Sequence, residues 1–330
     1  MPLYGVGDAE RALELFTSVP FAKPTELLGG ARVTFRHAGH ILGAATADIE
    51  WGGRRIVFSG DLGRYSDPFM LDPEPVAEAD FVMIESTYGN RIHEPTDPAE
   101  ALGAIVERTV RRGGTVVIPA FAVGRAQALL YYLWKLRVAG RIRDVPIYLD
   151  SPMAINATDM LCDHLEDHRL TPQVCRESCD IAIYTREVEQ SKAITASPYP
   201  KIVISASGMA SGGRVLHHLK AFAPDRKNSI VFSGFQAAGT RGRAMLEGAR
   251  EIKIHGQWIP VAAEVADLPM LSAHADANEL MRWLSGFRRP PNRVFIVHGE
   301  AQASEALRSR IDKELGWDAV VPRQSQRFEL

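Results

Sequence analysis

The sequence predicts an α/β protein in which one domain with a parallel sheet is inserted between the two halves of another. From about residue 97 to 250, apolar β-branched runs alternate with helical segments, as in a parallel sheet covered by helices. The flanks carry short strands that end in His, Asp or Glu. No internal repeat or low-complexity linker interrupts the chain, so one insertion explains both patterns. We therefore expect residues 1–89 and 257–330 to form one domain and residues 90–256 the inserted domain.

The individual elements follow from the spacing of apolar residues, with short apolar runs indicating strands and 3.6-residue periodicity indicating helices. In the first flank we expect a helix at 8–17 and strands near 31–37, 45–51, 54–59 and 80–85. In the middle we expect helices at 98–112, 124–138, from about 213, and at 239–248, with strands at 115–120, 145–150, 201–206, 229–234 and 251–256. In the last section we expect helices at 276–286 and 301–315 and strands at 293–298 and 318–321.

The composition is that of a soluble globular protein. Its 330 residues, 46% hydrophobic and 24% charged, are enough for two domains with separate cores. No apolar run reaches the ~20 residues of a membrane span, and no export signal precedes the first helix, so we expect a cytoplasmic protein. The net charge of −2 neither supports nor excludes a nucleic-acid partner, because a local basic groove is compatible with it.

Three cysteines are too few for a disulfide framework and fit a reducing compartment. Cys175 and Cys179 would be half of a zinc site, with His164 and His168 as the nearest candidates for the other half. Incidental thiols are the better interpretation, because a structural zinc site needs a full tetrahedral set.

Four segments look like parts of one metal site: AGHILGA (38–44), SGDLGR (59–64), SAHAD (272–276) and VHGE (297–300). Asp61 and His298 each follow a strongly apolar run, as expected for a side chain presented at the tip of a strand. Imidazole and carboxylate groups on rigid elements are suited to hydrolytic zinc. One such residue alone would more often be a turn or cap residue, but four segments together favour a metal site.

The order of eight motifs resembles one family. GHILGA, SGDLGR, IESTYG, IPAFAVGRAQ, SGMASGG, FQAAGTRGR, SAHAD and VHGE occur here as they do in the β-CASP branch of the metallo-β-lactamase-fold nucleases, which includes ribonuclease J and the polyadenylation endonuclease. The resemblance covers essentially the whole chain. It implies a partial metallo-β-lactamase αββα sandwich with an inserted β-CASP α/β domain of parallel sheet flanked by helices.

One departure from the family concerns the metal ligands. Members carry a His-x-His-x-Asp-His signature upstream of GHILGA, and no such string occurs in this sequence. The first helix reads like the one that follows the signature, so we expect an N-terminally truncated member with an incomplete metal site. From this we expect little nuclease activity, and self-association through the exposed edge of the truncated sheet or as a homodimer.

The resemblance also implies roles for individual residues. Asp61 would bridge two zinc ions, with His40 on one and His298 on the other. His274 would act at the scissile phosphate, oriented by Glu85. The implied catalytic residues are thus His274, Glu85 and Asp61.

The implied substrate is RNA, most simply single-stranded, although some relatives use DNA. Ser272 could donate a hydrogen bond to the phosphate, and Ser207, Gly208 and Met209 of the glycine-rich loop would face the substrate. The implied activity is metal-dependent endo- or exoribonuclease hydrolysis. The alternatives are a non-catalytic RNA-binding remnant and one half of a split enzyme.

Overall fold

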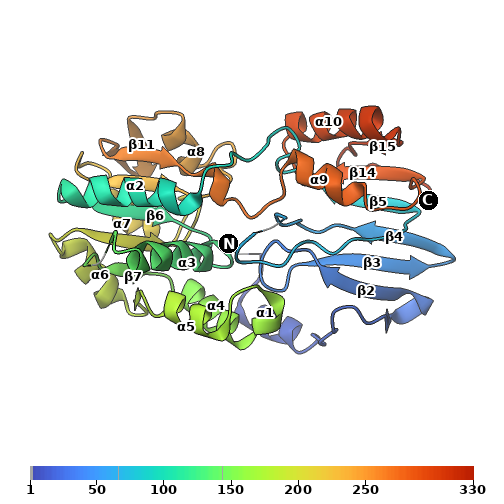
Figure 1. Ribbon diagram of the computed structural model, residues 1–330, viewed down its shortest axis with the longest axis horizontal. Helices are drawn as coiled ribbons and strands as arrows, with labels where there is room; N and C mark the ends of the chain where they lie inside the picture. The colour runs from blue at the N-terminus through green and yellow to red at the C-terminus, as the bar shows by residue number, and fades with distance from the viewer. Residues whose placement is uncertain (1–2, 66, 143) are drawn as a thin grey trace.

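The computed structural model describes residues 3–65, 67–142 and 144–330, and two sheets with their helices form its two halves (Figure 1). One is a seven-stranded mixed sheet in the order β1-β2-β3-β4-β5-β14-β15. Strands β1 to β4 pair antiparallel, whereas β4, β5, β14 and β15 run parallel to one another. The bounds are β1 Thr25–Glu26, β2 Arg32–His37, β3 Ala45–Trp51, β4 Arg54–Phe58, β5 Phe81–Glu85, β14 Arg293–Val297 and β15 Ala319–Val320.

The other is a six-stranded sheet in the order β13-β10-β6-β9-β7-β8, and all of its pairs are parallel. Its central strands are buried along their whole length, and their middle residues are apolar, because helices cover both faces. The bounds are β6 Thr115–Pro119, β7 Ile147–Leu149, β8 Ile183–Tyr184, β9 Lys201–Ser205, β10 Ser229–Phe232 and β13 Glu264–Asp267, with a separate hairpin of β11 Glu251–Ile254 and β12 Gln257–Pro260.

Most helices begin at a recognisable cap. Asp97, Ser151 and Thr171 each accept a backbone hydrogen bond at the start of a helix, and each is followed by proline at the first helical position. The helices are α1 Val6–Leu13, α2 Pro98–Arg111, α3 Arg125–Val138, α4 Pro152–Asp163, α5 Pro172–Cys179, α6 Val188–Ala196, α7 Val215–Phe222, α8 Arg241–Leu246, α9 Ala277–Leu284 and α10 Ala301–Arg310, with short helical turns at Leu28–Gly30, Leu165–Asp167, Pro269–Leu271 and Ile311–Leu315.

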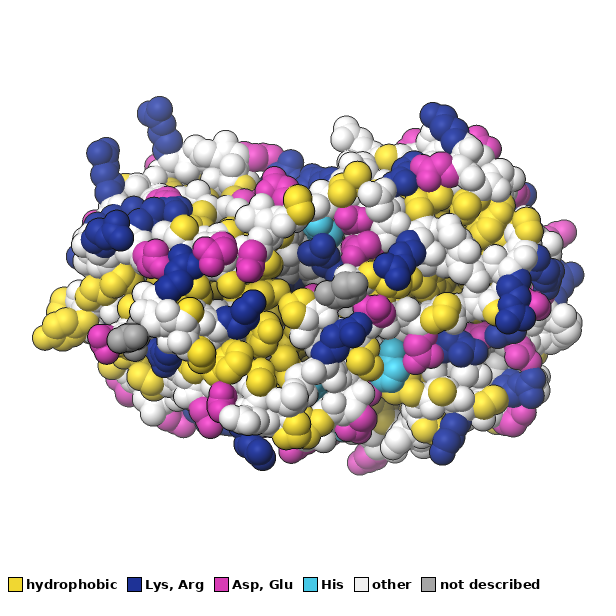
Figure 2. Space-filling view, viewed as in Figure 1, with side chains coloured by type: hydrophobic (Ala, Val, Ile, Leu, Met, Phe, Trp, Pro, Cys, Tyr) yellow, Lys and Arg dark blue, Asp and Glu magenta, His cyan; other side chains and the backbone are white. Residues whose placement is uncertain are grey.

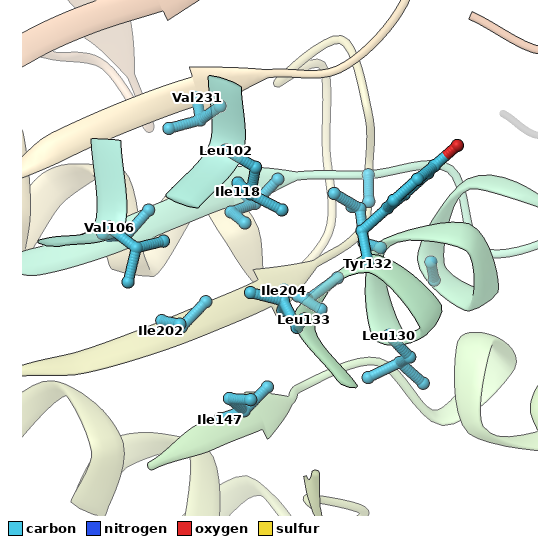
Figure 3. Close-up of a cluster of buried hydrophobic side chains, with 14 of the residues drawn as sticks. Leu102, Val106, Ile118, Leu130, Tyr132, Leu133, Ile147, Ile202, Ile204 and Val231 are labelled. Atoms are coloured by element: carbon cyan, nitrogen blue, oxygen red, sulfur yellow. The ribbon is translucent and has the colours of Figure 1, made fainter. Parts of the chain in front are cut away.

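A large apolar core lies between the parallel sheet and helices α2 and α3. Figure 3 shows Ile118, Ile204 and Ile147 of the strands facing Leu102 of α2 and Leu133 of α3. Full burial of each such side chain contributes about 1.5–3 kcal/mol. This core fixes the ends of the strands, from which several residues of the central cleft project.

The expected α/β class with helix-flanked parallel strands is confirmed. Expected strands agree with the structure within about two residues at most positions, but three helices (α4, α5 and α6) and four strands (β1, β8, β12 and β13) were not anticipated. Among the described residues, no helix is both long enough and apolar enough to cross a bilayer.

The strand pairing bears on where the inserted domain ends. Strand β13 pairs with β10 of the parallel sheet from Ser229 to Phe232, although it lies beyond residue 256. Glu264 of this strand also forms ion pairs with Arg108 and Arg112 of α2. We therefore propose that the inserted domain continues to about Asp267 and that the chain rejoins the mixed sheet after it.

The ion pairs of Glu264 predict a pH-dependent contribution to stability. Hydrogen bonds from Arg108, opposed by burial and helped by Arg112, lower the pKa of this carboxyl to about 2 from the ordinary 4.5. A lowered pKa stabilises the folded state above the unfolded value, so the contribution is complete above pH ~4.5 and is lost as the pH falls toward 2. Glu264→Gln should therefore lower the free energy of unfolding by about 1 kcal/mol at neutral pH.

Urea unfolding of the wild type and Glu264→Gln at pH 7 and pH 3 measures this difference. Glu177→Gln, which removes an exposed carboxylate on α5, is the matched control. A difference in the free energy of unfolding between the wild type and Glu264→Gln that is the same at both pH values would contradict the prediction.

Candidate active site

A cleft of about 740 Å³ lies where loops of the mixed sheet meet loops of the parallel sheet. From the mixed sheet and the segments beside it come four of the sequence-predicted residues, His40, Asp61, His274 and His298. The wall contributed by the parallel sheet is largely apolar and includes Phe121, Met153, Met209 and Phe235. The cleft thus joins titratable groups on one side to aromatic and aliphatic side chains on the other.

Asp61 brings two of the predicted histidines together. Its Oδ1 atom lies 3.2 Å from Nδ1 of His298, and its Oδ2 atom lies 4.0 Å from Nε2 of His40. One ligand atom from each of His40, Asp61 and His274 lies within 4.8 Å of the others. His274 and His298 lie more than 200 positions after Asp61, so only the tertiary fold assembles these residues.

Close backbone packing places His40 beside Asp61. A Cβ atom on Gly63 would lie 1.9 Å from the carbonyl oxygen of Gly39, so the two loops touch only because residue 63 is glycine. Gly63 also donates a backbone hydrogen bond to Ala38. At the other side of the site, His298 has a φ of 54°, an uncommon value for a residue with a side chain. Such strain is often found at functional positions.

The residues present suit a divalent metal ion such as Zn²⁺. Burial, reinforced by the neighbouring His274, lowers the pKa of His40 to about 4, so its imidazole is neutral at neutral pH, as a metal ligand must be. The Nδ1 atom of His40 is buried without a hydrogen-bond partner among the described residues. A carboxylate between two imidazoles is a donor set that zinc accepts. His40, Asp61 and His298 would hold the ion.

Glu85 and His274 form a buried pair next to these residues. Both carboxylate oxygens of Glu85 lie 3.1 Å from Nδ1 of His274. Burial alone would raise the pKa of Glu85, but hydrogen bonds from His274, Thr87 and Leu62 outweigh it and hold the pKa below its ordinary value. The carboxylate therefore stays charged and fixes the proton of His274 on Nδ1, which leaves Nε2 for chemistry.

The predicted substrate-facing residues divide into two groups. Ser272 and Met209 line the cleft. Ser207 instead caps its own loop, because its Oγ atom accepts hydrogen bonds from the backbone of Ser211 and Gly212. Gly208 lies against Phe121, whose ring a Cβ atom at 208 would approach to 2.7 Å. The structure does not place Ser207 and Gly208 on the cleft wall; their contacts shape the loop that carries Met209.

Two residues of the site region escaped the sequence reasoning. His93, which has no motif around it, is partly buried, and its Nε2 atom lies 2.9 Å from the carbonyl oxygen of His274. Thr87 belongs to the ESTYG motif, and its hydroxyl lies 3.3 Å from Nδ1 of His298. Thr87 lay inside a motif already singled out, whereas nothing in the local sequence of His93 indicates its contact.

The cysteines gather away from the cleft. The sulfur of Cys162 lies 2.7 Å from that of Cys175 and 3.7 Å from that of Cys179. The expected partner His168 does not join them, because its ring nitrogens contact the backbone of Leu161 and Leu170. Burial raises the pKa of Cys175 to about 12, so this thiol is protonated at neutral pH.

Comparison with known proteins places this geometry among RNA-processing enzymes. Residues 126–245 match a family model described as the Beta-Casp domain, and residues 258–322 match one described as the Zn-dependent metallo-hydrolase RNA specificity domain. The chain is 35% identical over 314 residues to ribonuclease TTHA0252 of Thermus thermophilus, covering 93% of this chain and 71% of that protein.

Two archaeal proteins are also similar. Transcription termination factor FttA of Pyrococcus horikoshii is 34% identical over 351 residues, covering 100% of this chain and 53% of that protein. An RNase J-like protein of Methanocaldococcus jannaschii is 31% identical over 328 residues, covering 97% of this chain and 76% of that protein. The chain thus spans about half of the length of the termination factor.

The geometry around Asp61 predicts how a metal ion affects stability. Zn²⁺ or Mn²⁺ should raise the melting temperature of the wild type in a concentration-dependent way, because a ligand that binds only the folded state stabilises it by mass action. Asp61→Asn should lose this shift, since the charged oxygens between the two imidazoles are gone. Asp180→Asn, at an exposed position following α5, should keep it. An undiminished shift in Asp61→Asn would place the ion elsewhere.

Proposed function

This chain belongs to the β-CASP branch of the metallo-β-lactamase-fold RNA nucleases, and on that basis we propose that its cleft binds single-stranded RNA and hydrolyses a phosphodiester with His274 as the acid–base group. The observation that carries this proposal is the buried Glu85–His274 pair, which faces the same cleft as Asp61, His40 and His298. A donor set for a metal ion and an oriented imidazole directly beside it are what phosphodiester hydrolysis requires.

Each residue has a chemical task in this proposal. His40, Asp61 and His298 would hold a divalent ion, which would supply a water of lowered pKa and stabilise negative charge on phosphate oxygens. Glu85 holds the proton on Nδ1 of His274 and stabilises the positive charge that the ring gains when it carries a second proton. From Nε2, His274 donates that proton to the oxygen that leaves the phosphorus, which would otherwise depart as an unfavourable alkoxide.

The shape of the cleft supports a single-stranded substrate. The rings of Phe121 and Phe235 lie on the wall opposite the histidines, and aromatic rings bind the unstacked bases that only single strands offer. Acidic and basic side chains are interspersed on the face shown in Figure 2, with no broad basic surface for a duplex. Recognition would therefore take place inside the cleft.

A non-catalytic RNA-binding role is not favoured. A buried carboxylate costs several kcal/mol unless it is paired and hydrogen-bonded. Glu85 is 1% exposed, and its best-placed side-chain partner is the imidazole of His274 at the cleft. A module that only binds RNA has no need for this pair.

Substitution of the acid–base pair predicts a graded loss of cleavage. His274→Ala should reduce the cleavage rate by about 10²–10⁴-fold, the range for removal of a general acid or base. Glu85→Gln should cost about 10- to 100-fold, because it misorients the imidazole without removing it. Release of fragments from 5′-labelled single-stranded RNA in the presence of Zn²⁺ or Mn²⁺ measures both.

His217→Ala is the matched control, since this histidine is exposed on α7 and outside the cleft. Its cleavage rate should equal that of the wild type. Equal rates in the wild type and His274→Ala would refute the proposed chemistry.

A further inference from the structure

The motif IPAFAVGRAQ enters the cleft at the start of helix α3, and two of its residues are explained by the fold. Gly124 has a φ of 77°, and a Cβ atom there would lie 2.3 Å from Cγ2 of Ile41, so glycine lets α3 reach the loop that carries His40. Gln127 donates from its amide to the carbonyl oxygens of Ala122 and Ala154. These contacts fix the turn before the helix, and they leave Arg125 between them.

Arg125 is buried, yet the fold does not pair its charge. The residue is 9% exposed, and its guanidinium makes no hydrogen bond or ion pair with the residues that the structure describes. A guanidinium has five N–H donors, and a buried cation without partners is costly. Burial lowers the pKa of Arg125 to about 10, so the group stays charged at neutral pH. Its donors face the cleft, where an anion from outside the described chain would supply a partner.

The surroundings of Arg125 carry no competing carboxylate at bonding distance. The carboxylate that acts most on its charge is Asp67, whose Oδ1 atom accepts hydrogen bonds from the backbone of Phe69 and Met70. Tyr88 and Tyr132 are the other groups that favour its charge. A second cation, Arg64, opposes it. Asp67 therefore does not neutralise the guanidinium by direct contact, and the N–H donors of Arg125 remain available to a bound anion.

Position decides which anion fits. Arg125 lines the main cleft together with His40 and His274, and it also lines an adjoining pocket of about 280 Å³. The charged side chains that line this pocket are of both signs: Arg64, Lys135, Asp67, Glu94 and Asp97. The two cavities thus meet at Arg125. It is also the first residue of a 14-residue helix, and the helix dipole favours negative charge at this end, although the N–H groups of Arg125 and Ala126 already donate to Val123 and Phe121.

We propose that Arg125 is a phosphate-binding residue. Its guanidinium pairs with a phosphodiester of the bound RNA strand next to the phosphodiester that is cleaved. This inference rests on the proposed function, since it takes RNA as the ligand of the cleft. A planar guanidinium matches two phosphate oxygens, which a lysine does not reproduce. A strand that runs from the main cleft into the adjoining pocket passes Arg125, and the pairing compensates both charges. Arg125 is thus a positioning residue for the reaction.

The test measures RNA binding without catalysis. Anisotropy of a fluorescent single-stranded RNA with a 5′-hydroxyl is recorded in EDTA over a series of NaCl concentrations. Arg125→Met should weaken binding about tenfold and reduce the slope of log K against log[NaCl] by about 0.7, the value for one contact to a single strand. Arg125→Lys should keep most of the slope but bind several-fold more weakly. Arg111→Gln removes an exposed charge on α2 that lines neither cavity, and its slope should not change.

Thermal unfolding of the free proteins separates this role from a structural one. Arg125→Met should melt at or above the wild-type temperature, because it removes an unpaired buried charge. A melting temperature several degrees lower together with an unchanged salt slope would overturn the proposal and make Arg125 structural. The proposal is also overturned if Arg125→Met weakens the binding of RNA with a 5′-phosphate but not that of RNA with a 5′-hydroxyl. The ligand of Arg125 would then be the terminal phosphate. A wild type that binds no RNA would overturn both this inference and the proposed function.

Discussion

The buried carboxylate of Glu85 is the constraint on which the site depends. A charge that is 1% exposed must be fully hydrogen-bonded, and the partners of Glu85 come from three separate parts of the sequence. Its carboxylate accepts hydrogen bonds from the backbone N–H of Leu62, next to Asp61, and from the ring of His274. The backbone N–H of Thr87, just after β5, donates a third. Satisfying this one group fixes the loop that carries Asp61, the end of β5 and the segment before α9 relative to one another. The chemistry proposed for the cleft follows from that arrangement.

Glycine contacts extend this constraint to the other half of the molecule. Gly63 lets the Asp61 loop touch the His40 loop, and Gly124 lets α3 touch Ile41 in the same loop. The parallel sheet thereby places Phe121, Met209 and Arg125 opposite the histidines. Two separate cores of buried side chains, one against each sheet, hold these loops at fixed distances. The cleft is a product of both halves, which explains why neither half carries the whole motif set.

Much of this arrangement could be predicted from the sequence, and the exceptions have physical reasons. Asp61 and His298 could be located because each follows an apolar strand, β4 and β14, and Glu85 because it ends β5. His40 and His274 were found through their motifs, since His274 follows the helical turn Pro269–Leu271 and not a strand. The helices between residues 152 and 196 were missed although Ser151–Pro152 and Thr171–Pro172 are typical helix starts. Their short lengths and mixed apolar patterns make periodicity a weak signal there.

Other features depend on tertiary contacts that no local pattern reveals. His93 is held by the backbone of His274, at a distance of 181 residues in sequence. The glycine-rich loop suggested phosphate binding, but the hydroxyl of Ser207 accepts hydrogen bonds from backbone N–H groups of the same loop. The unpaired state of Arg125 is visible only when every possible partner around it has been placed. The hydrogen-bond partners of polar side chains, or the lack of them, are thus what the structure shows and the sequence alone does not.

The central claim is that Asp61 joins His40 and His298 into one metal site beside the Glu85–His274 pair. Anomalous diffraction above the zinc edge, from crystals soaked in Zn²⁺, tests it most directly. We expect a strong anomalous peak within bonding distance of the Asp61 carboxylate and of a histidine nitrogen, with Glu85 still on His274. A peak confined to other residues such as the three cysteines, with none at Asp61, would contradict the account.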